Sequence, residues 1–309
     1  MKIFHSINDF SSKKKTILTL GTFDGVHVGH EKILKNIIQN TENEKYESAV
    51  LTFFPHPRMV LQEHSDIKLL NTIDEKIDLL EKIGVENLVI HPFDEKFSRL
   101  TAEEFVRTVL VDQLRIKKII IGHDHRFGRN RTANIDDLVA FGKQYDFEVE
   151  QISVQEINAI SVSSTKIRNA LLEGNMALAN KYLGYDYFLT GIVVKGKQLG
   201  RTIGFPTANL KIEENYKLIP QNGVYIVKSI IDQNTVFGIM NIGFNPTVDG
   251  KNQSIEIHYF DFNADLYNQK IRVSILQKIR SEQKFKSINL LKDQLEKDTK
   301  TALEYLNKF

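Results

Sequence analysis

Short apolar runs alternate with helical patterns along the first half of the chain. The runs that indicate strands are Ile17–Leu20, Ala49–Phe53, Asn87–Ile90, Lys118–Ile121 and Glu148–Ile152. The helical patterns are Glu31–Gln39, Ile73–Ile83, Thr101–Val111 and Ile135–Lys143. Continuous apolar strands separated by helices are typical of a parallel sheet covered on both faces. The first half is therefore predicted to be a doubly wound α/β domain, in which ligands bind at the carboxyl ends of the strands.

The hydrophobic pattern changes its period near Phe188. From there apolar residues alternate with polar ones in the segments 188–196, 223–231, 235–243, 254–262 and 270–276. Short strands separated by Gly, Asn and Pro favour a small antiparallel barrel or sandwich. The segment Lys286–Leu306 keeps one apolar face and is predicted to be a helix. Because a short helical piece, Met176–Tyr182, ends at Gly184, the expected domains are residues 1–184 and 185–309.

The turn after the first predicted strand contains His27-Val28-Gly29-His30. A strand, a tight turn and a helix together place an anion against the free N–H groups of the helix N-terminus. Gly29 has no Cβ to keep a ligand away from the backbone, and two imidazoles could hold nucleotide phosphates while charge builds on them. The alternative is a pair of exposed loop histidines near a helix cap. The position between a strand and an amphipathic helix favours the phosphate site, and the pattern resembles the HxGH nucleotidylyltransferases.

Three further loops at the same predicted sheet edge are rich in polar and basic residues. They are Phe54-Pro55-His56-Pro57-Arg58, the segment Gly122–Arg131, and the segment Ser161–Arg168 that opens a helix at Ile167–Leu172. Taken singly, they read as a rigid turn, a basic loop and a helix cap. His123-Asp124-His125 lacks a third metal ligand at a recognised spacing, so arginines around a phosphate or an aromatic ring explain that loop better. Together the four loops favour a nucleotide site.

Two features of the second half carry chemistry. In Phe205-Pro206-Thr207-Ala208-Asn209, residues 207 and 209 point the same way if the segment is extended, and they could offer two neutral oxygens to Mg²⁺. In the 254–259 strand, Glu256 lies on the face opposite to the isoleucines. A carboxylate there is usually a solvent-facing residue, but beside a metal–nucleotide loop it becomes a candidate general base.

Composition and charge narrow the function classes. The 309 residues are 41% apolar and 26% charged, with a formal charge of +2 and no cysteine. This charge argues against a general nucleic-acid partner, and the lack of cysteine excludes disulfides and thiolate metal sites. The chain shows no apolar run near the roughly 20 residues of a membrane span and no secretory signal at its start. The expectation is a cytoplasmic protein with small-molecule substrates, with self-association left open.

In their order and spacing, GTFDGVHVGH, FFPHP, GHDHRFG and SSTKIR resemble the flavin-adenylylating module of bacterial bifunctional riboflavin kinase/FAD synthetases. The resemblance implies that the FMN phosphate attacks the α-phosphorus of ATP to give FAD and pyrophosphate. The residues that it assigns to ATP are Gly21, Phe23, Asp24, His27, Gly29, His30, Ser164, Thr165 and Arg168. The residues that it assigns to the flavin are Pro55, His56, Asp124 and Phe127. His125 departs from the family pattern, which usually has an aromatic residue there.

The segments GRTIGFPTANL, NGVY, MNIGFNPT and IRSEQKF, together with the Glu256 strand, resemble riboflavin kinase. This family is a six-stranded barrel that phosphorylates the 5′-hydroxyl of riboflavin. The resemblance implies that Thr207 and Asn209 hold Mg²⁺ and that Glu256 accepts the hydroxyl proton. The residues that it assigns to ATP in this module are Gly200, Gly204, Pro206, Thr207 and Asn209.

The leading hypothesis is therefore a bifunctional enzyme that converts riboflavin to FMN and FMN to FAD, with ATP and Mg²⁺ in both steps. One alternative is a riboflavin kinase whose adenylyl-transfer module is altered at His125. Another is a flavin- or nucleotide-binding regulator that reuses the fold, since fold alone does not define function. A regulator predicts that key polar residues are missing, whereas the histidine pair, Thr207, Asn209 and Glu256 are all present.

Overall fold

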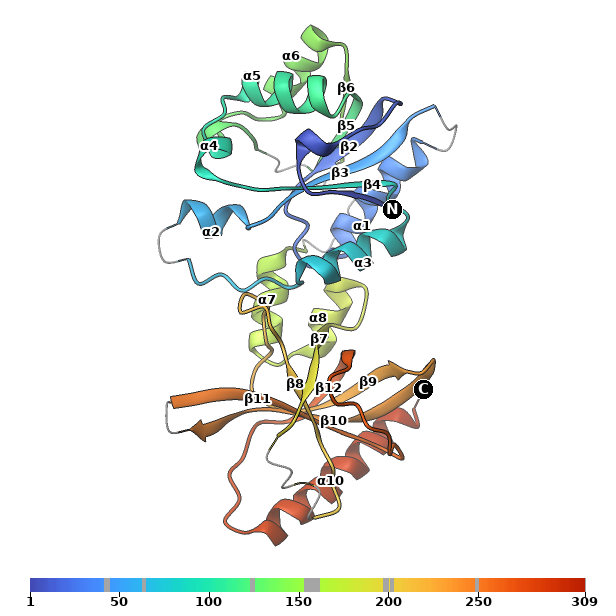
Figure 1. Cartoon of the computed structure of the whole chain (residues 1–309), viewed down its shortest axis with the longest axis vertical. Coiled ribbons are helices and arrows are strands. Elements are labelled where there is room, and N and C mark those ends of the chain that lie inside the picture. The colour runs from blue at the N-terminus through green and yellow to red at the C-terminus, as the bar shows by residue number, and fades with distance from the viewer. Residues whose placement is uncertain are drawn as a thin grey trace. The chain divides into compact units, whose positions relative to one another are not determined.

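The computed structural model describes residues 1–41, 45–62, 65–122, 126–152, 162–196, 200, 203–247 and 250–308. The packing of the chain divides it into two compact units, Met1–Ser164 and Thr165–Phe309. Figure 1 shows the elements of each unit with their labels. The first unit contains a parallel sheet and the second a closed barrel, as the two hydrophobic periods predict.

The first unit is built on a six-stranded sheet with the order β1-β4-β3-β2-β5-β6, in which every pair of neighbours is parallel. The strands are β1 (Lys2–Phe4), β2 (Thr16–Leu20), β3 (Glu47–Phe53), β4 (Asn87–His91), β5 (Ile116–Gly122) and β6 (Glu148–Ile152). The five predicted strands are confirmed. The edge strand β1 was not predicted, because three residues are too few to show a periodic pattern.

Helices cover both faces of this sheet, which confirms the doubly wound α/β fold (Figure 1). They are α1 (Val28–Gln39), α2 (Pro57–Leu61), α3 (Ile73–Ile83), α4 (Glu95–Ser98), α5 (Ala102–Glu104), which continues into a π-helix at Phe105–Gln113, and α6 (Ile135–Tyr145). Successive strand residues point to opposite faces. Leu18 therefore packs in the cluster with the π-helix, while Ile17 packs in the cluster with α1 and α3.

The second unit is a closed antiparallel barrel with the strand order β10-β11-β8-β7-β12-β9. Its strands are β7 (Phe188–Val194), β8 (Ala208–Lys211), β9 (Gly223–Ile231), β10 (Asn234–Thr247), β11 (Gly250–Tyr259) and β12 (Lys270–Arg280). The barrel, one of the two architectures that the alternating pattern predicted, is confirmed. The short strand β8 completes it, although its sequence reads as the end of a Gly/Pro loop.

Two helices, α7 (Ser164–Leu172) and α8 (Met176–Leu183), lie between the sheet and the barrel in the sequence. They pack with the barrel: the Asn180 carboxamide accepts from the Tyr187 N–H and donates to the Ile275 carbonyl. The Gln221 N–H donates to the Leu171 carbonyl. The compact unit thus begins at Thr165. The domain boundary expected after Gly184 stays a prediction.

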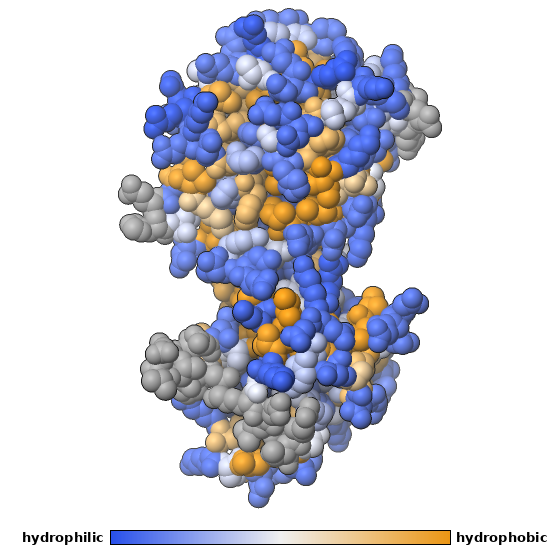
Figure 2. All heavy atoms as spheres, in the orientation of Figure 1, coloured by the Kyte–Doolittle hydropathy of each residue, from blue (hydrophilic) through white to orange (hydrophobic). Residues whose placement is uncertain are grey.

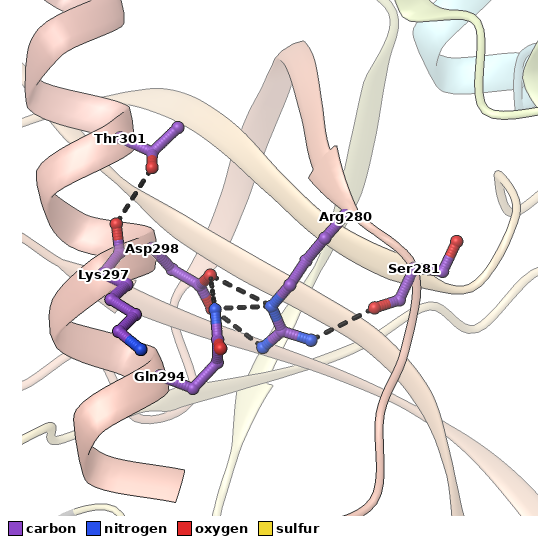
Figure 3. Close-up of polar contacts among 6 residues, drawn as sticks. All are labelled: Arg280, Ser281, Gln294, Lys297, Asp298 and Thr301. Atoms are coloured by element: carbon purple, nitrogen blue, oxygen red, sulfur yellow. Dashed lines mark hydrogen bonds and ion pairs between the residues drawn. The ribbon is translucent and has the colours of Figure 1, made fainter. Parts of the chain in front are cut away.

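The C-terminal helix α10 (Ile288–Leu306) is held to the barrel by a buried ion pair, drawn in Figure 3. Arg280, at the end of β12, donates from Nε and Nη2 to the Asp298 carboxylate at 2.8–3.0 Å. Asp298 is 1% exposed and also accepts from Gln294, one turn earlier on the same helix. Ser287 caps the helix by accepting from the Leu290 N–H. One carboxylate therefore connects the helix to the last barrel strand.

The surface is mainly hydrophilic on the face shown in Figure 2, with apolar residues gathered over parts of both units. Within the described ranges, no helix is long and apolar enough to span a membrane.

We predict that Asp298→Ala destabilises the barrel by about 3 kcal/mol, because the Arg280 side chain, which is only 16% exposed, then loses its charged partner. Denaturant unfolding followed by a probe in the barrel measures this change. Asp293→Ala, on the exposed side of the same helix, is the matched control and is expected to change the stability by less than about 0.5 kcal/mol. Equal effects of the two substitutions would contradict a specific role of the ion pair.

Candidate functional site

The turn between β2 and α1 has an unusual backbone. Phe23 and Val26 have φ angles of 45° and 36°, a region that non-glycine residues rarely adopt, and Gly25 between them has φ of 90°. The turn is fixed at its start, where the Gly21 N–H donates to the Leu51 carbonyl of β3 at 3.0 Å. Such a conformation persists only where the surrounding structure holds it. The strand, turn and helix expected around the histidine motif are confirmed.

The turn brings the two predicted histidines together. The His27 and His30 rings stack with their centroids 3.7 Å apart. The Phe23 ring packs edge-to-face with His30, and their ring centroids are 5.1 Å apart. His27 is the N-cap of α1, and its Nδ1 accepts from the His30 N–H at 3.4 Å. The His30 Nδ1 is buried and has no hydrogen-bond partner among the described residues. The pair therefore lies at the N-terminus of α1, and Gly29, which separates the two residues in the sequence, is in the first turn of the helix.

Both histidines are neutral at pH 7. Burial lowers the pKa of His27 to about 4. Burial also holds the pKa of His30 well below its usual value, and the neighbouring His27 and Lys76 lower it further. A bound polyphosphate would act in the opposite direction, because a nearby negative charge favours the imidazolium form. The site can thus take up protons when an anionic ligand arrives.

Asp24 connects the turn to the two neighbouring segments. It is 1% exposed, and its Oδ1 accepts from the Leu70 N–H at 2.8 Å. Its carbonyl accepts from the Ser164 Oγ at 2.9 Å, so two of the predicted ATP residues meet at this point. Thr165 and Arg168 follow on α7, and their contact with ATP stays a prediction.

Lys76, on α3, contacts the turn between β2 and α1. It was not among the predicted site residues. Its Nζ donates to the Thr22 carbonyl at 2.7 Å, although the side chain is only 5% exposed. One signal in the sequence points to it. Lys76 falls on the face of α3 that carries Ile73, Ile77 and Leu80, so a charge interrupts an otherwise apolar face.

The predicted flavin residues belong to two separate loops. His56 is the N-cap of α2, where its Nδ1 accepts from the Arg58 N–H at 3.1 Å, and it follows the cis peptide bond Phe54–Pro55. Phe127 is 6% exposed, and its ring lies 6.1 Å from that of Phe105 in the core of the sheet. Asp124, like His123 and His125, lies outside the described residues. The flavin contacts stay predictions.

In the barrel, the register of the strands brings the predicted kinase residues together. Glu256 on β11 is paired with Asn209 on β8, so their side chains leave the barrel wall on the same face. On its other side Glu256 is paired with Asn241 of β10. The three residues form a polar row across β8, β11 and β10.

The loop before β8 contacts β11 through His258. The His258 Nδ1 lies 2.9 Å from the Pro206 carbonyl, and its ring lies 5.0 Å from that of Phe205. His258 is two residues from Glu256 and therefore shares its face of β11. Its contact places Thr207 and Asn209 beside the carboxylate strand.

Asn209 lies against Gly196 and at the wall of a cavity. A Cβ on Gly196 would overlap the Asn209 carboxamide, so the glycine allows the backbone to lie directly against that side chain. Asn209 also lines a cavity of about 390 Å³, together with Leu210, Lys217 and Ile255. A hydroxyl and a carboxamide oxygen are neutral ligands that fit Mg²⁺, which takes its remaining ligands from water and nucleotide phosphates. Gly200, Gly204 and Pro206 lie on the loop that leads to this strand.

Comparison with known proteins matches the two units separately. Residues 9–166 match the family model of FAD synthetase, and residues 183–306 match that of riboflavin kinase. The fold and site thus define a protein with one nucleotidyl-transfer domain and one flavokinase domain.

Relatives with both domains cover almost the whole chain. The bifunctional riboflavin kinase/FMN adenylyltransferase of Buchnera aphidicola subsp. Schizaphis graminum is 39% identical, with 99% of each chain covered. The protein of the same name from Escherichia coli K12 is 36% identical, with 99% of this chain and 98% of its own chain covered. That from Bacillus subtilis is 37% identical, with 95% of this chain and 93% of its own chain covered. A solved structure titled a macrolide-efflux protein from Streptococcus pneumoniae is 32% identical, with a TM-score of 0.88 over 97% of each chain. The chain belongs to the bifunctional riboflavin kinase/FMN adenylyltransferase family.

We predict that the His27 imidazole titrates near pH 4 without nucleotide and at a higher pH with ATP bound, because phosphate charge favours the imidazolium. NMR of the imidazole resonances, assigned with His27→Asn, measures both midpoints. Because the folded-state pKa is below the unfolded value of about 6.5, the neutral ring stabilises the fold above that pH, and this stability is lost as the pH falls toward 4. A midpoint near 6.5 without nucleotide would contradict the buried neutral pair.

Proposed function

We propose that the first unit transfers the adenylyl group of ATP to FMN and that the barrel transfers the γ-phosphoryl group of ATP to riboflavin. The observation that carries this assignment is the separate match of the two units to the two family models. Relatives that contain both domains share 36–39% identity with nearly the whole chain. In this order riboflavin becomes FMN in the barrel, and FMN becomes FAD in the sheet domain.

In the adenylyl transfer, an oxygen of the FMN phosphate attacks the α-phosphorus of ATP. The new P–O bond forms as the bond to the β-phosphate oxygen breaks, and pyrophosphate leaves. The His27–His30 pair at the N-terminus of α1 would hold the phosphates, where free N–H groups and the helix dipole favour negative charge. Ser164, bonded to Asp24, would complete the phosphate side of the site.

In the kinase reaction, the riboflavin 5′-hydroxyl attacks the γ-phosphorus of ATP and ADP leaves. Glu256 would accept the hydroxyl proton, and Thr207 and Asn209 would hold Mg²⁺ beside it. Mg²⁺, when bound, supplies charge neutralisation on the phosphates. His258 would keep the loop in place through the Pro206 carbonyl. The cytoplasmic location expected from the cysteine-free sequence stays a prediction.

The purified chain is expected to form FMN and then FAD from riboflavin, ATP and Mg²⁺, with the flavins resolved by chromatography. His27→Ala with His30→Ala should abolish FAD formation and leave FMN formation, because only the sheet domain loses its phosphate ligands. Glu256→Gln should abolish FMN formation, while FAD still forms when FMN is supplied. Loss of both steps in either folded variant would refute the assignment of the domains. FMN without FAD in the unaltered chain would favour the alternative based on His125.

We also expect Asn209→Ala to raise the Mg²⁺ concentration at half-maximal kinase activity at least tenfold, because one of the two neutral ligands is lost. Adenylyl transfer by the same variant serves as the control and should keep its Mg²⁺ dependence. An unchanged Mg²⁺ requirement of the kinase would show that Asn209 is not a ligand.

A further inference from the structure

A buried lysine, Lys76, contacts the backbone of the turn 22–26, which precedes the histidine pair of the first unit. Lys76 is 5% exposed and lies in the first turn of α3, on a face otherwise made of Ile73, Ile77 and Leu80. Burial of an ammonium group is costly, and an apolar side chain of this length would pack with the same neighbours at lower cost. A charge at this position therefore needs an explanation beyond the packing of α3.

The contacts of the ammonium group are directed at the turn. Its Nζ donates to the Thr22 carbonyl at 2.7 Å, and that carbonyl also accepts from the Thr52 Oγ1 on β3 at 3.3 Å. Thr22 precedes Phe23, the first residue of the turn with a positive φ. Lys76 thus holds the backbone at the point where the turn enters its rare conformation.

The position of Lys76 is itself well fixed. A capping box begins α3: the Thr72 Oγ1 accepts from the Glu75 N–H at 3.2 Å, and a Glu75 carboxylate oxygen accepts from the Thr72 N–H at 3.0 Å. Just before this box, the Leu70 N–H donates to Asp24 of the turn. The start of α3 and the turn are therefore connected at Asp24 and at Thr22.

The charge of Lys76 also acts on the nucleotide site. Among the residues that the structure describes, the charged and titratable groups that interact with it are Asp24, from the turn, and His30, from α1. His27 lies one ring further, stacked on His30. Since both histidines are neutral in the absence of ligand, Lys76 supplies positive charge behind them before any phosphate binds.

We propose that Lys76 is a positioning residue of the adenylyl-transfer site, which holds the turn 22–26 through the Thr22 carbonyl and supplies a fixed positive charge that attracts the nucleotide phosphates to the histidine pair. This proposal rests on the proposed function of the first unit.

The proposal predicts a dependence on pH that a purely structural role would not produce. Burial lowers the pKa of the Lys76 ammonium to about 8, against the opposing effect of the Asp24 carboxylate. The group is charged at pH 7 and loses its charge as the pH rises through 8. Attraction of ATP should weaken over the same range, since a low-dielectric site strengthens the interaction between buried charges.

The experiment compares the full chain with Lys76→Met, Lys76→Arg and the control Lys82→Met. Lys82 lies on the same helix but is exposed. Lys82→Met therefore measures the effect of replacing a lysine of α3 by methionine away from the nucleotide site. FMN is supplied, and kcat and KM for ATP in FAD formation are measured from pH 6.5 to 9.5. ATP affinity is measured by calorimetry. Thermal unfolding reports on the folding of the first unit, and the kinase reaction reports on the folding of the barrel.

Lys76→Met is expected to lower kcat/KM for adenylyl transfer at least tenfold at pH 7 and to leave kinase activity unchanged. In the unaltered chain kcat/KM should fall above pH 8, and Lys76→Arg should move this fall upward by at least one pH unit, because a guanidinium stays charged. Lys82→Met should match the unaltered chain throughout.

A folded Lys76→Met variant with unchanged kcat/KM and unchanged pH profile would overturn the proposal. If Lys76→Met does not fold, the Lys76→Arg profile decides, and a fall at the same pH as in the unaltered chain overturns it. Failure of the unaltered chain to form FAD would refute the proposed function instead, and the effect of Lys76→Met on ATP affinity would still test the charge.

Discussion

The backbone of residues 22–26 is the constraint on which the first site depends. Two non-glycine residues in this turn have a positive φ, and such a conformation is stable only when its surroundings hold it. Here it is held by a lysine under Thr22, by the Leu70 N–H at Asp24 and by a serine hydroxyl at the Asp24 carbonyl. Because the turn sets where α1 begins, it also sets the stacking of His27 on His30.

The electrostatics of this site follow from its burial. Two imidazoles in contact, with an ammonium group nearby, cannot all carry charge in a desolvated environment. The histidines remain neutral, and the lysine, which faces a carboxylate, keeps its proton at pH 7. A site of this kind gains positive charge as a polyphosphate binds. It thereby avoids the cost of three buried cations in the free protein.

In the barrel, the predicted site residues are positioned by strand register and not by a turn with positive φ angles. Pairing of β8 with β11 places an amide beside a carboxylate, and pairing of β11 with β10 adds a second amide on the other side. A shift by one residue would turn each of these side chains to the other face. The histidine that holds the Pro206 carbonyl fixes the approach of the loop to this row. Closure of the barrel keeps the strands in that register.

Hydrophobic period and loop chemistry were enough to predict both folds and to place the motif residues at strand ends, because these patterns depend on local geometry. His27, His30 and Asp24 lie together as a strand–turn–helix motif implies, and the alternating pattern after Phe188 predicted a barrel or a sandwich, of which the barrel is present. The sequence could not show that Lys76 lies under Thr22, since the two residues are 54 positions apart and only the parallel sheet brings α3 beneath the turn. Nor could it show that Asn209 pairs with Glu256, because register across a closed barrel is decided by the packing of all its strands. The sequence by itself determined the motifs and their elements, and the tertiary structure alone decided their long-range partners and their charge states.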